Sequence, residues 1–359
     1  MGSKPVLVHV INNLGMGGAE TLLVNTIPLL QNYDHVLICL SAPDTLKSRI
    51  ESHLKGFHLL NIKGKSQWIR GIVQLRRLIR RYKPVLVHSH LQLSSLLTRI
   101  ACPNKVPLVF TIHSTYSQDA FQHSRVALWL ERLTVRKKHA LIGVSRFVVD
   151  DYQRAVPFKG GKFILYNFVA PRFFNAGQPS SPTTSTIRLV AVGTLKEAKN
   201  YSFLLEAFRQ LQDLPVHLDI YGDGPEKALL QQLIDTHRLN VTLKGRVDQP
   251  ERVFPRYHVY IISSRHEGYG IAPLEAMAAG LPVLASSLPV LKEVIGEENA
   301  LFFDLSNPLQ LVQLIKDIIA DPELLQPYIL KSRDRAKNLA GQERYLADLN
   351  SIYHTIINP

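Results

Sequence analysis

The sequence predicts an α/β protein with two domains, each a parallel sheet covered by helices on both faces. The chain has 359 residues, which is long for a single hydrophobic core, so two domains are expected. Short apolar runs alternate with amphipathic segments through the first half, and the same alternation restarts in the second half. Continuously apolar strands separated by helices are typical of doubly wound sheets.

The first half contains six runs rich in Val, Ile and Leu, which predict strands. They are VLVHVI (6–11), HVLICLS (35–41), FHLLNI (57–62), VLVHSH (85–90), LVFTIH (108–113) and ALIGVS (140–145), and the apolar segment FILYNFV (163–169) comes after them. The segment 171–186 that follows is rich in Pro, Ser and Thr and predicts a linker. We therefore expect a first domain over 1–170 and a linker over 171–186.

The second half repeats this pattern with six further runs. They are IRLVAVG (187–193), VHLDIYG (216–222), VTLKG (241–245), VYIIS (259–263), PVLAS (282–286) and ALFF (300–303). A second domain is expected over 187–338. The remaining segment, 339–359, contains a predicted helix at 343–358 that lies beyond the last strand. Two facing doubly wound domains place a ligand in the cleft at the carboxyl ends of their strands.

The segment HEGYGIAPLE carries Glu267 and, eight positions later, Glu275. It follows an apolar strand, passes through two glycines and enters a helix that Gly280 ends. Ala272, the expected N-cap, has no side-chain oxygen, so the first helical amides can bind phosphate or sugar oxygens. The two carboxylates can accept hydrogen bonds from hydroxyls. Alternatively, Glu275 is only an acid that suits the helix dipole.

This stretch, read as SRHEGYGIAPLEAMAAGLPVLAS, resembles the retaining glycosyltransferases of family 4, which have the GT-B fold. The resemblance implies two facing Rossmann-like domains and a final helix that crosses back onto the first domain. It also implies that Glu275 holds ribose hydroxyls and that Glu267 holds hydroxyls of the transferred sugar. The backbone around the sugar and diphosphate would come from Gly268, Tyr269, Gly270 and Ile271.

A glycine-rich turn, NNLGMGGAET (12–21), follows the first strand. Gly17 and Gly18 allow close approach of the backbone to a phosphate at the start of the next helix. No Gly-Lys-Ser/Thr follows, and Glu20 stands at the third glycine position of the dinucleotide-binding pattern, so neither of those sites is predicted. A plain tight turn is the alternative. The family resemblance places this loop against the donor diphosphate.

A second segment of the resemblance, GTLKEAKN (193–200), follows the first strand of the second domain. The family pattern has an arginine and a lysine that grip the diphosphate. Lys199 matches, whereas Thr194 stands at the arginine position and cannot make a bidentate phosphate contact. Lys199 is therefore expected to neutralise most of the charge, with Lys196 or Arg265 as helpers. In the related segment GDGPE, Asp223 is expected to cap its own turn.

Two histidines end predicted strands of the first domain, His90 in LVHSH and His113 in VFTIH. Histidines at the carboxyl ends of parallel strands point to function, although a capped or partly exposed residue is the alternative. The resemblance places His113 beside the transferred sugar. The implied catalytic residues are His113, Glu267 and Lys199, and His90 is expected on the acceptor side.

Neither a metal nor a cofactor is expected. The sequence has no Asp-x-Asp pair and no His/Cys cluster with the spacing of metal ligands. The charge of the leaving group would instead be stabilised by backbone amides, by Lys199 and by helix N-termini. A nucleotide-diphosphate sugar enters as substrate.

Charge is distributed unevenly along the chain. Residues 1–180 hold 24 Lys and Arg against 8 Asp and Glu, and the remainder holds 18 against 21. The segment 67–84 predicts a basic amphipathic helix whose apolar face packs on its own domain. We expect this basic half to contact an anionic membrane rather than nucleic acid, because no aromatic-interleaved basic stripe is present. With two isolated cysteines and no secretory signal, a cytoplasmic protein at the inner face of the membrane is expected.

The predicted function is transfer of a hexose-type sugar from a UDP- or GDP-sugar, with retention at the anomeric carbon. The expected acceptor is a saccharide or a lipid-linked one, such as an undecaprenyl-linked glycan or a lipopolysaccharide precursor, in the synthesis of cell-surface glycans. A nucleotide-sugar epimerase or hydrolase can share the fold. Because of Thr194, a catalytically silent nucleotide-sugar-binding protein is a further alternative.

Overall fold

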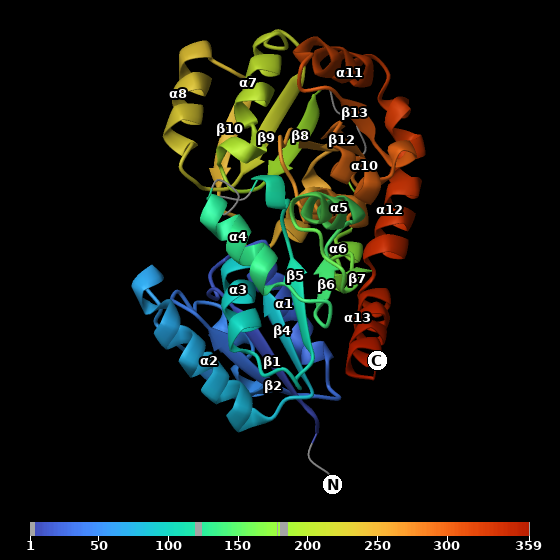
Figure 1. The fold of residues 1–359 in the computed structure, drawn as a ribbon. Coiled ribbons are helices and arrows are strands. Elements are labelled where there is room, and N and C mark those ends of the chain that lie inside the picture. Colours follow the sequence, from blue (N-terminus) through green and yellow to red (C-terminus); the bar gives the residue numbers. More distant parts are fainter. Residues whose placement is uncertain (1–3, 119–123, 178, 180–185, 359) are drawn as a thin grey trace. The chain divides into compact units, whose positions relative to one another are not determined.

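The computed structural model describes residues 4–118, 124–177, 179 and 186–358. The chain divides into two compact units. Unit 1 runs to Asn167 and resumes at Tyr345, and unit 2 covers Phe168–Arg344. In each unit a central parallel sheet is flanked by helices (Figure 1). The predicted α/β class with two doubly wound sheets is therefore confirmed.

Unit 1 has a seven-stranded parallel sheet in the order β3-β2-β1-β4-β5-β6-β7. Its strands are β1 (Val6–Ile11), β2 (Asp34–Cys39), β3 (Leu54–Leu59), β4 (Leu86–His90), β5 (Leu108–Ile112), β6 (Ala140–Gly143) and β7 (Gly161–Ile164). The strand order reverses between β1 and β4, so the loops that leave these strands diverge and open space at their carboxyl ends. Asn12 and Leu91 follow the two strands and line this space.

Helices cover both faces of this sheet. They are α1 (Gly18–Thr26), α2 (Trp68–Tyr82), α3 (Gln92–Ala101), α4 (Arg125–Thr134), α5 (Arg146–Ala155) and α13 (Gln342–Ile357). The predicted basic helix is α2, and its apolar face packs on its own unit, because Leu75 and Ile79 are fully buried against Val8 and Val87. On the other sheet face, α1 packs Leu23 into a separate apolar cluster.

Unit 2 has a six-stranded parallel sheet in the order β10-β9-β8-β11-β12-β13. Its strands are β8 (Ile187–Val192), β9 (Val216–Tyr221), β10 (Val241–Gly245), β11 (Val259–Ile262), β12 (Val283–Ser286) and β13 (Leu301–Phe303). Its helices are α6 (Pro171–Phe174), α7 (Tyr201–Arg209), α8 (Lys227–His237), α9 (Ile271–Ala278), α10 (Pro289–Ile295), α11 (Pro308–Ala320) and α12 (Gln326–Ala340). Here the order reverses between β8 and β11, which again leaves space where those strands end.

The chain passes from unit 1 to unit 2 after Asn167, a few residues before the expected linker 171–186. The first part of that segment is α6, whose Phe173 is buried in unit 2 with its ring 6.1 Å from that of Phe254. Much of the rest, residues 178 and 180–185, lies outside the described part of the chain. The expected boundary at 338/339 falls inside α12, and unit 2 extends to Arg344.

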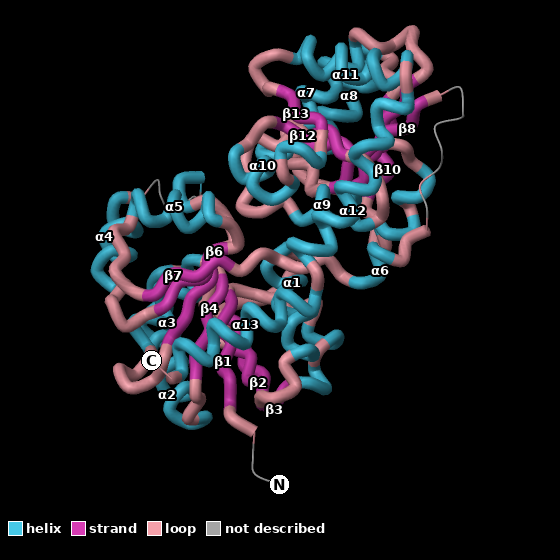
Figure 2. Tube along the Cα trace, turned by 90° about the vertical axis from the view of Figure 1, so that its right-hand side faces the viewer, coloured by secondary structure: helices cyan, strands magenta, loops and turns pink. Residues whose placement is uncertain are grey.

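The last helix returns to unit 1, as the sequence predicted. Figure 2 shows α13 lying across the sheet of unit 1. Two tyrosines attach it: the Tyr345 hydroxyl lies 3.1 Å from Thr26 Oγ1, and the Tyr353 hydroxyl lies 2.6 Å from His88 Nδ1. Both tyrosine side chains are buried. Burial of the rings and pairing of the hydroxyls together anchor the end of the chain.

A buried ion pair joins three helices of unit 1. The Arg99 guanidinium on α3 donates to the Glu131 carboxylate on α4, and both side chains are almost fully excluded from solvent. The Tyr152 hydroxyl on α5 donates to the other Glu131 oxygen at 2.7 Å. The same burial and the Glu131 charge raise the pKa of Tyr152. Removing either partner would leave the other charge buried and unpaired, which is costly.

Candidate active site

In unit 2 the helix α9 begins without a side-chain cap on its first backbone amides. Gly270 is the N-cap, in a left-handed conformation with φ +79°, and no side chain caps the helix. The expected N-cap, Ala272, is wrong by two residues, because the glycine turns the chain into the helix earlier. A Cβ at Gly270 would lie 2.7 Å from Leu291 Cδ2, so both the conformation and the close packing require glycine. The helix therefore starts at Ile271 without a side-chain cap, a geometry that suits an anion.

Next to this turn the structure pairs Lys199 with Glu267. Lys199 Nζ lies 2.5 Å from Glu267 Oε1, and Ser264 Oγ donates to the same oxygen at 2.7 Å. Ser263 Oγ also donates to the Lys199 carbonyl at 3.0 Å, which fixes the loop after β8 against the end of β11. The two side chains are only 19% and 11% exposed. Two residues that are far apart in sequence thus form an ion pair at the carboxyl end of the sheet.

The other side chains that are predicted to bind the phosphates are more exposed to solvent than Lys199 is. Thr194 and Lys196 are exposed, and the Arg265 guanidinium lies 3.8 Å from Glu197 at the surface. Asp223 accepts a hydrogen bond from the Gly224 amide at 3.0 Å, which confirms that it caps its own turn. Among the predicted phosphate-binding cations, Lys199 is therefore the least exposed and has the shortest ion pair.

Glu275 lies on α9 in a partly buried position between an acid and a base. Burial raises the pKa of the Glu275 carboxyl to about 8, Arg172 lowers it, and Glu251 raises it further. Arg172 itself pairs with Glu251, with Nε 3.4 Å from Oε2. At pH 7 Glu275 is therefore mostly protonated, although it keeps an oxygen that can accept a hydrogen bond.

In unit 1 the predicted glycine loop leads into α1. Gly17 is the N-cap and no side chain caps the helix. The Glu20 carboxyl folds back against the loop, since a Cβ at Gly17 would lie 2.1 Å from Glu20 Oε2. At Gly18 nothing lies within 4 Å of such a Cβ, so this side of the loop is open. Burial raises the pKa of the Glu20 carboxyl.

His90 and His113 lie together in unit 1, with ring centroids 5.7 Å apart. A cavity of about 110 Å³ at the reversal of strand order is lined by Asn12, Leu91, Gln92, Leu93, Ile112, His113 and Ser114. Burial lowers the pKa of His113 to about 4, so its ring is neutral at pH 7. A neutral imidazole can donate or accept a hydrogen bond but carries no charge.

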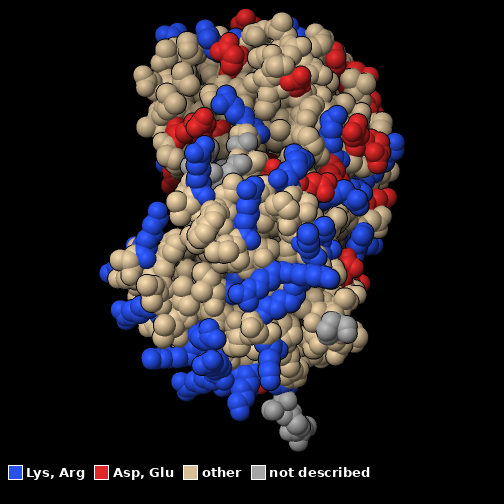
Figure 3. Space-filling view, viewed as in Figure 1, with Lys and Arg blue, Asp and Glu red and all other residues tan. Residues whose placement is uncertain are grey.

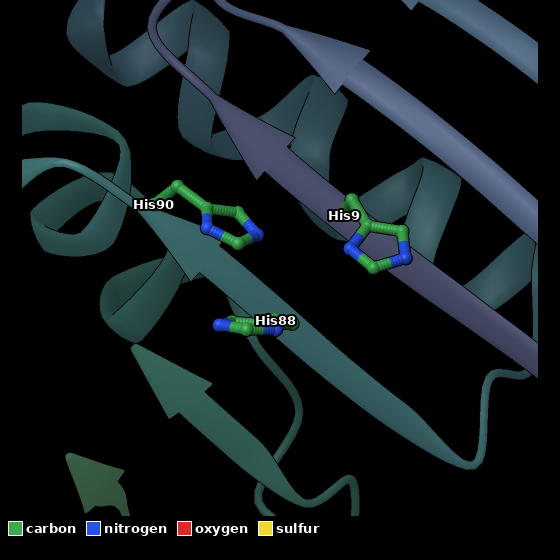
Figure 4. A group of neighbouring side chains, drawn as sticks. All are labelled: His9, His88 and His90. Carbon is green, nitrogen blue, oxygen red and sulfur yellow. The ribbon is translucent and has the colours of Figure 1, made fainter. Parts of the chain in front are cut away.

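Sequence reasoning missed His9 and His88, which lie beside His90 (Figure 4). His9 and His88 are register partners on neighbouring strands, and the alternation of β4 puts His88 and His90 on the same face. One ligand atom from each ring can be chosen so that all three lie within 4.8 Å of one another. The pattern H-x-H was visible in the sequence, but the third imidazole comes from a different strand.

Burial and the neighbouring imidazoles lower the pKa values of His9, His88 and His90, so these rings are neutral. His35 Nε2 donates to the Leu30 carbonyl at 3.0 Å, so its Nδ1 accepts from His9 Nε2 at 3.1 Å. His88 uses both ring nitrogens, one with Tyr353 and one with Thr111 Oγ1, each at 2.6 Å. Burial lowers the pKa of His88 to about 3. Both ring nitrogens of His88 are already engaged in hydrogen bonds. The cluster is therefore better explained as a neutral hydrogen-bonded core than as a metal site.

Two family models match this chain in succession. The model described as Glycosyltransferase Family 4 matches residues 16–172, and the model described as Glycosyl transferases group 1 matches residues 177–335. Together with the two doubly wound sheets and the acids Glu267 and Glu275 around the start of α9, these matches define a glycosyltransferase with the GT-B fold. The chain belongs to glycosyltransferase family 4.

Individual relatives are similar over nearly the whole chain. The O-antigen biosynthesis glycosyltransferase WclY of Escherichia coli is 23% identical, over 86% of this chain and 87% of the relative. The alpha-monoglucosyldiacylglycerol synthase of Acholeplasma laidlawii is 22% identical, over 98% and 93%. Among solved structures, HepE of Anabaena in complex with UDP and glucose covers 99% of this chain and 100% of its own, with a TM-score of 0.81 and 17% identity.

Proposed function

We propose that this glycosyltransferase moves a hexose-type sugar from a UDP- or GDP-sugar to a saccharide or lipid-linked acceptor, with retention and without a metal ion. The observation that carries the proposal is the Lys199–Glu267 pair beside the uncapped start of α9. A cation, a carboxylate and a helix start without a side-chain cap, all at one sheet edge, match the diphosphate and hydroxyls of a nucleotide sugar. The similarity of the fold to HepE, which was solved with UDP and glucose, supports this donor class.

Each residue has a defined task in the proposed reaction. The Lys199 ammonium stabilises the charge that grows on the departing diphosphate, and the amides from Gly268 to Ile271 surround the sugar and phosphate. Glu267 accepts hydrogen bonds from hydroxyls of the transferred sugar. The neutral His113 ring hydrogen-bonds the sugar from the side of unit 1. The Gly17–Gly18 loop offers backbone amides at the start of α1 to the diphosphate.

In the bond-changing step, the bond from the anomeric carbon to the diphosphate oxygen breaks. The acceptor hydroxyl oxygen bonds to the same face of that carbon, so the configuration is retained. The acceptor proton passes to the departing phosphate oxygen, and the products are the glycosylated acceptor and a nucleoside diphosphate. Positioning and charge stabilisation supply the catalysis, since no step requires a covalent enzyme intermediate.

The basic surface of unit 1 favours an acceptor attached to an anionic membrane. Figure 3 shows Lys and Arg side chains spread over the visible face of this unit, with few acids among them. In the described ranges no helix is long and apolar enough to cross a bilayer. The proposed location is therefore the cytoplasmic face of the membrane, where positive charge meets anionic headgroups. His90 would lie on the acceptor side of the site.

Incubation with a panel of UDP- and GDP-sugars, with and without acceptors, tests the function. A transferase releases nucleoside diphosphate in an acceptor-dependent way, and the proton spectrum of the product shows the donor's anomeric configuration. Loss of turnover with EDTA would contradict a metal-independent reaction. Acceptor-independent release would indicate a hydrolase, an interconverted sugar pool would indicate an epimerase, and binding without turnover would indicate a silent protein.

Titration of Glu275 predicts a pH-dependent affinity for UDP. The ligand-free carboxyl has a pKa of about 8, and ribose hydroxyls donate better to its ionised form. Binding should therefore release a proton, and affinity should rise about tenfold from pH 7 to pH 9, where the phosphates are already ionised. Calorimetry in two buffers with different ionisation enthalpies measures the proton release.

The variant Glu275→Gln serves as the control for this prediction. It should bind UDP more weakly by roughly 1–3 kcal/mol, because a charged hydrogen bond is lost. Its affinity should also stop depending on pH in this range. If the UDP affinity of the wild type does not change between pH 7 and pH 9, and the variant binds UDP as tightly as the wild type, the role of Glu275 is refuted.

A further inference from the structure

An exposed apolar stripe runs along α4 in unit 1. Val126, Trp129 and Leu133 are 66%, 60% and 60% exposed. Their spacing of three and four residues puts them on one face of the helix. A tryptophan with two aliphatic neighbours on one exposed helix face indicates a surface that another apolar phase covers. The functional site described above uses none of these residues.

The charges around this stripe are positive. Arg125 and Arg132 lie on α4 itself, and residues 136–138, Arg-Lys-Lys, follow its end. The one acid of the helix, Glu131, is buried in its ion pair with Arg99. The solvent-facing surface of α4 therefore presents apolar and basic groups only. This combination is typical of helices that lie in the plane of a membrane interface.

A basic cavity of about 260 Å³ lies at the end of the same helix. It is lined by Arg132, Val135, Arg136, Lys137, Val156, Pro157, Phe158 and Lys159. None of these eight residues is acidic. Arg132 is held in place because its Nε and Nη2 donate to the Ala155 carbonyl at 2.9 and 2.7 Å. Lys137 and Lys159 add two exposed ammonium groups to the rim.

We infer that α4 and this cavity form a docking site for an anionic phospholipid in a bilayer. The headgroup phosphate binds among the cations of the cavity, and Val126, Trp129 and Leu133 enter the interface between headgroups and acyl chains. Nucleic acid would satisfy the cations but would leave the aliphatic side chains in water. An anionic bilayer offers phosphates to the cations and an apolar phase to the aliphatic and aromatic side chains.

This inference rests on the proposed function in one respect, namely that the acceptor is carried by the membrane. β5 ends at Ile112, His113 follows it, and the chain continues into α4 at Arg125. α4 therefore lies in the same unit as His113 and follows it in the chain. The inference adds a specific surface to the general attraction of the basic unit, and it differs from α2, whose main apolar face is buried.

The test uses the full-length protein and vesicles of phosphatidylcholine with and without 30% phosphatidylglycerol. Replacing the stripe by Val126→Ser, Trp129→Ser and Leu133→Ser should lower binding to the anionic vesicles at least tenfold. Lys137→Gln with Lys159→Gln should lower it severalfold and weaken its salt dependence. The matched control is Ile69→Ser with Val73→Ser on α2, where the side chains are 77% and 43% exposed and lie in the same basic unit.

Fluorescence gives a second readout that does not depend on the triple variant. With Trp68→Phe, Trp129 becomes the only tryptophan, and its emission should shift to shorter wavelength on anionic vesicles and be quenched by brominated lipid. Absence of both signals would overturn the inference. The inference would also be overturned if the α2 control variant lost as much vesicle binding as the α4 variant. It would be overturned as well if RNA displaced the protein from the vesicles and the emission of Trp129 had not shifted.

The same variants separate this inference from the proposed function. Transfer to a water-soluble acceptor should be unchanged in the triple variant, whereas transfer to an acceptor embedded in vesicles should fall with the loss of binding. If vesicle binding follows the predicted pattern but no nucleotide sugar is turned over, the docking site stands and the function fails. If turnover is normal and Trp129 gives no signal, the function stands and the docking site fails.

Discussion

Replacing Lys199 by alanine should lower kcat/KM for sugar transfer by about 10²–10³-fold, the usual cost of removing one group that stabilises developing charge in a shielded site. Lys199 is only 19% exposed and lies 2.5 Å from Glu267. In the proposed reaction this ammonium balances the charge of the departing diphosphate, and Thr194 cannot share that role. Steady-state kinetics with the donor found in the sugar screen measures the effect.

Two further variants make this prediction specific. Lys199→Arg keeps the charge and should recover part of the lost activity, although its planar group fits the pocket differently. Lys227→Ala is the matched control, because that lysine belongs to the same unit, is 55% exposed and lies 3.9 Å from Asp223. It should leave kcat/KM within about twofold of the wild type, since exposed pairs contribute little. Equal losses at Lys199 and Lys227 would contradict the assignment.

Replacing Glu131 by glutamine should destabilise unit 1 by about 3–5 kcal/mol, the typical cost of breaking a buried pair by removing one partner. Arg99 would keep its charge in a site from which solvent is excluded, and the hydrogen bond from Tyr152 would lose a charged acceptor. Both tryptophans of the chain, Trp68 and Trp129, lie in unit 1. Urea unfolding followed by tryptophan fluorescence therefore reports on this unit alone.

Two controls accompany this measurement. The double variant Arg99→Met with Glu131→Met removes both charges and should be less destabilised than Glu131→Gln, because no buried charge is left alone. Glu206→Gln breaks an exposed pair, with Arg209 at 3.1 Å and side chains 53% and 47% exposed. It should cost at most about 1 kcal/mol. If Glu131→Gln lowers the free energy of unfolding no more than Glu206→Gln does, the buried pair does not stabilise unit 1.

Local sequence patterns predicted the strands and the basic helix well. Strands such as Val6–Ile11 and Val241–Gly245 are found at their expected bounds, and the predicted helix 67–84 corresponds to α2 over Trp68–Tyr82. Apolar periodicity produces these results because it records which side of each element faces a core. Element ends depend on individual conformations instead. Gly270 shows this, because its left-handed backbone starts α9 two residues before the expected position.

The sequence by itself determined the class of protein. The acids Glu267 and Glu275, the glycine loops and two rounds of strand–helix alternation are local features that can be read in order along the chain. The family pattern in the sequence also predicted Lys199 as a phosphate ligand. These features could be predicted because each depends on residues within one turn, one strand or one helix.

Only the tertiary structure decided which of these residues meet. The pairing of Lys199 with Glu267, the histidine cluster of β1 and β4, and the burial of Glu131 with Arg99 all join residues from different elements. Burial of Glu131 is also what leaves the exposed surface of α4 purely basic and apolar. Distances and burial of this kind depend on strand order and packing, which local periodicity does not encode.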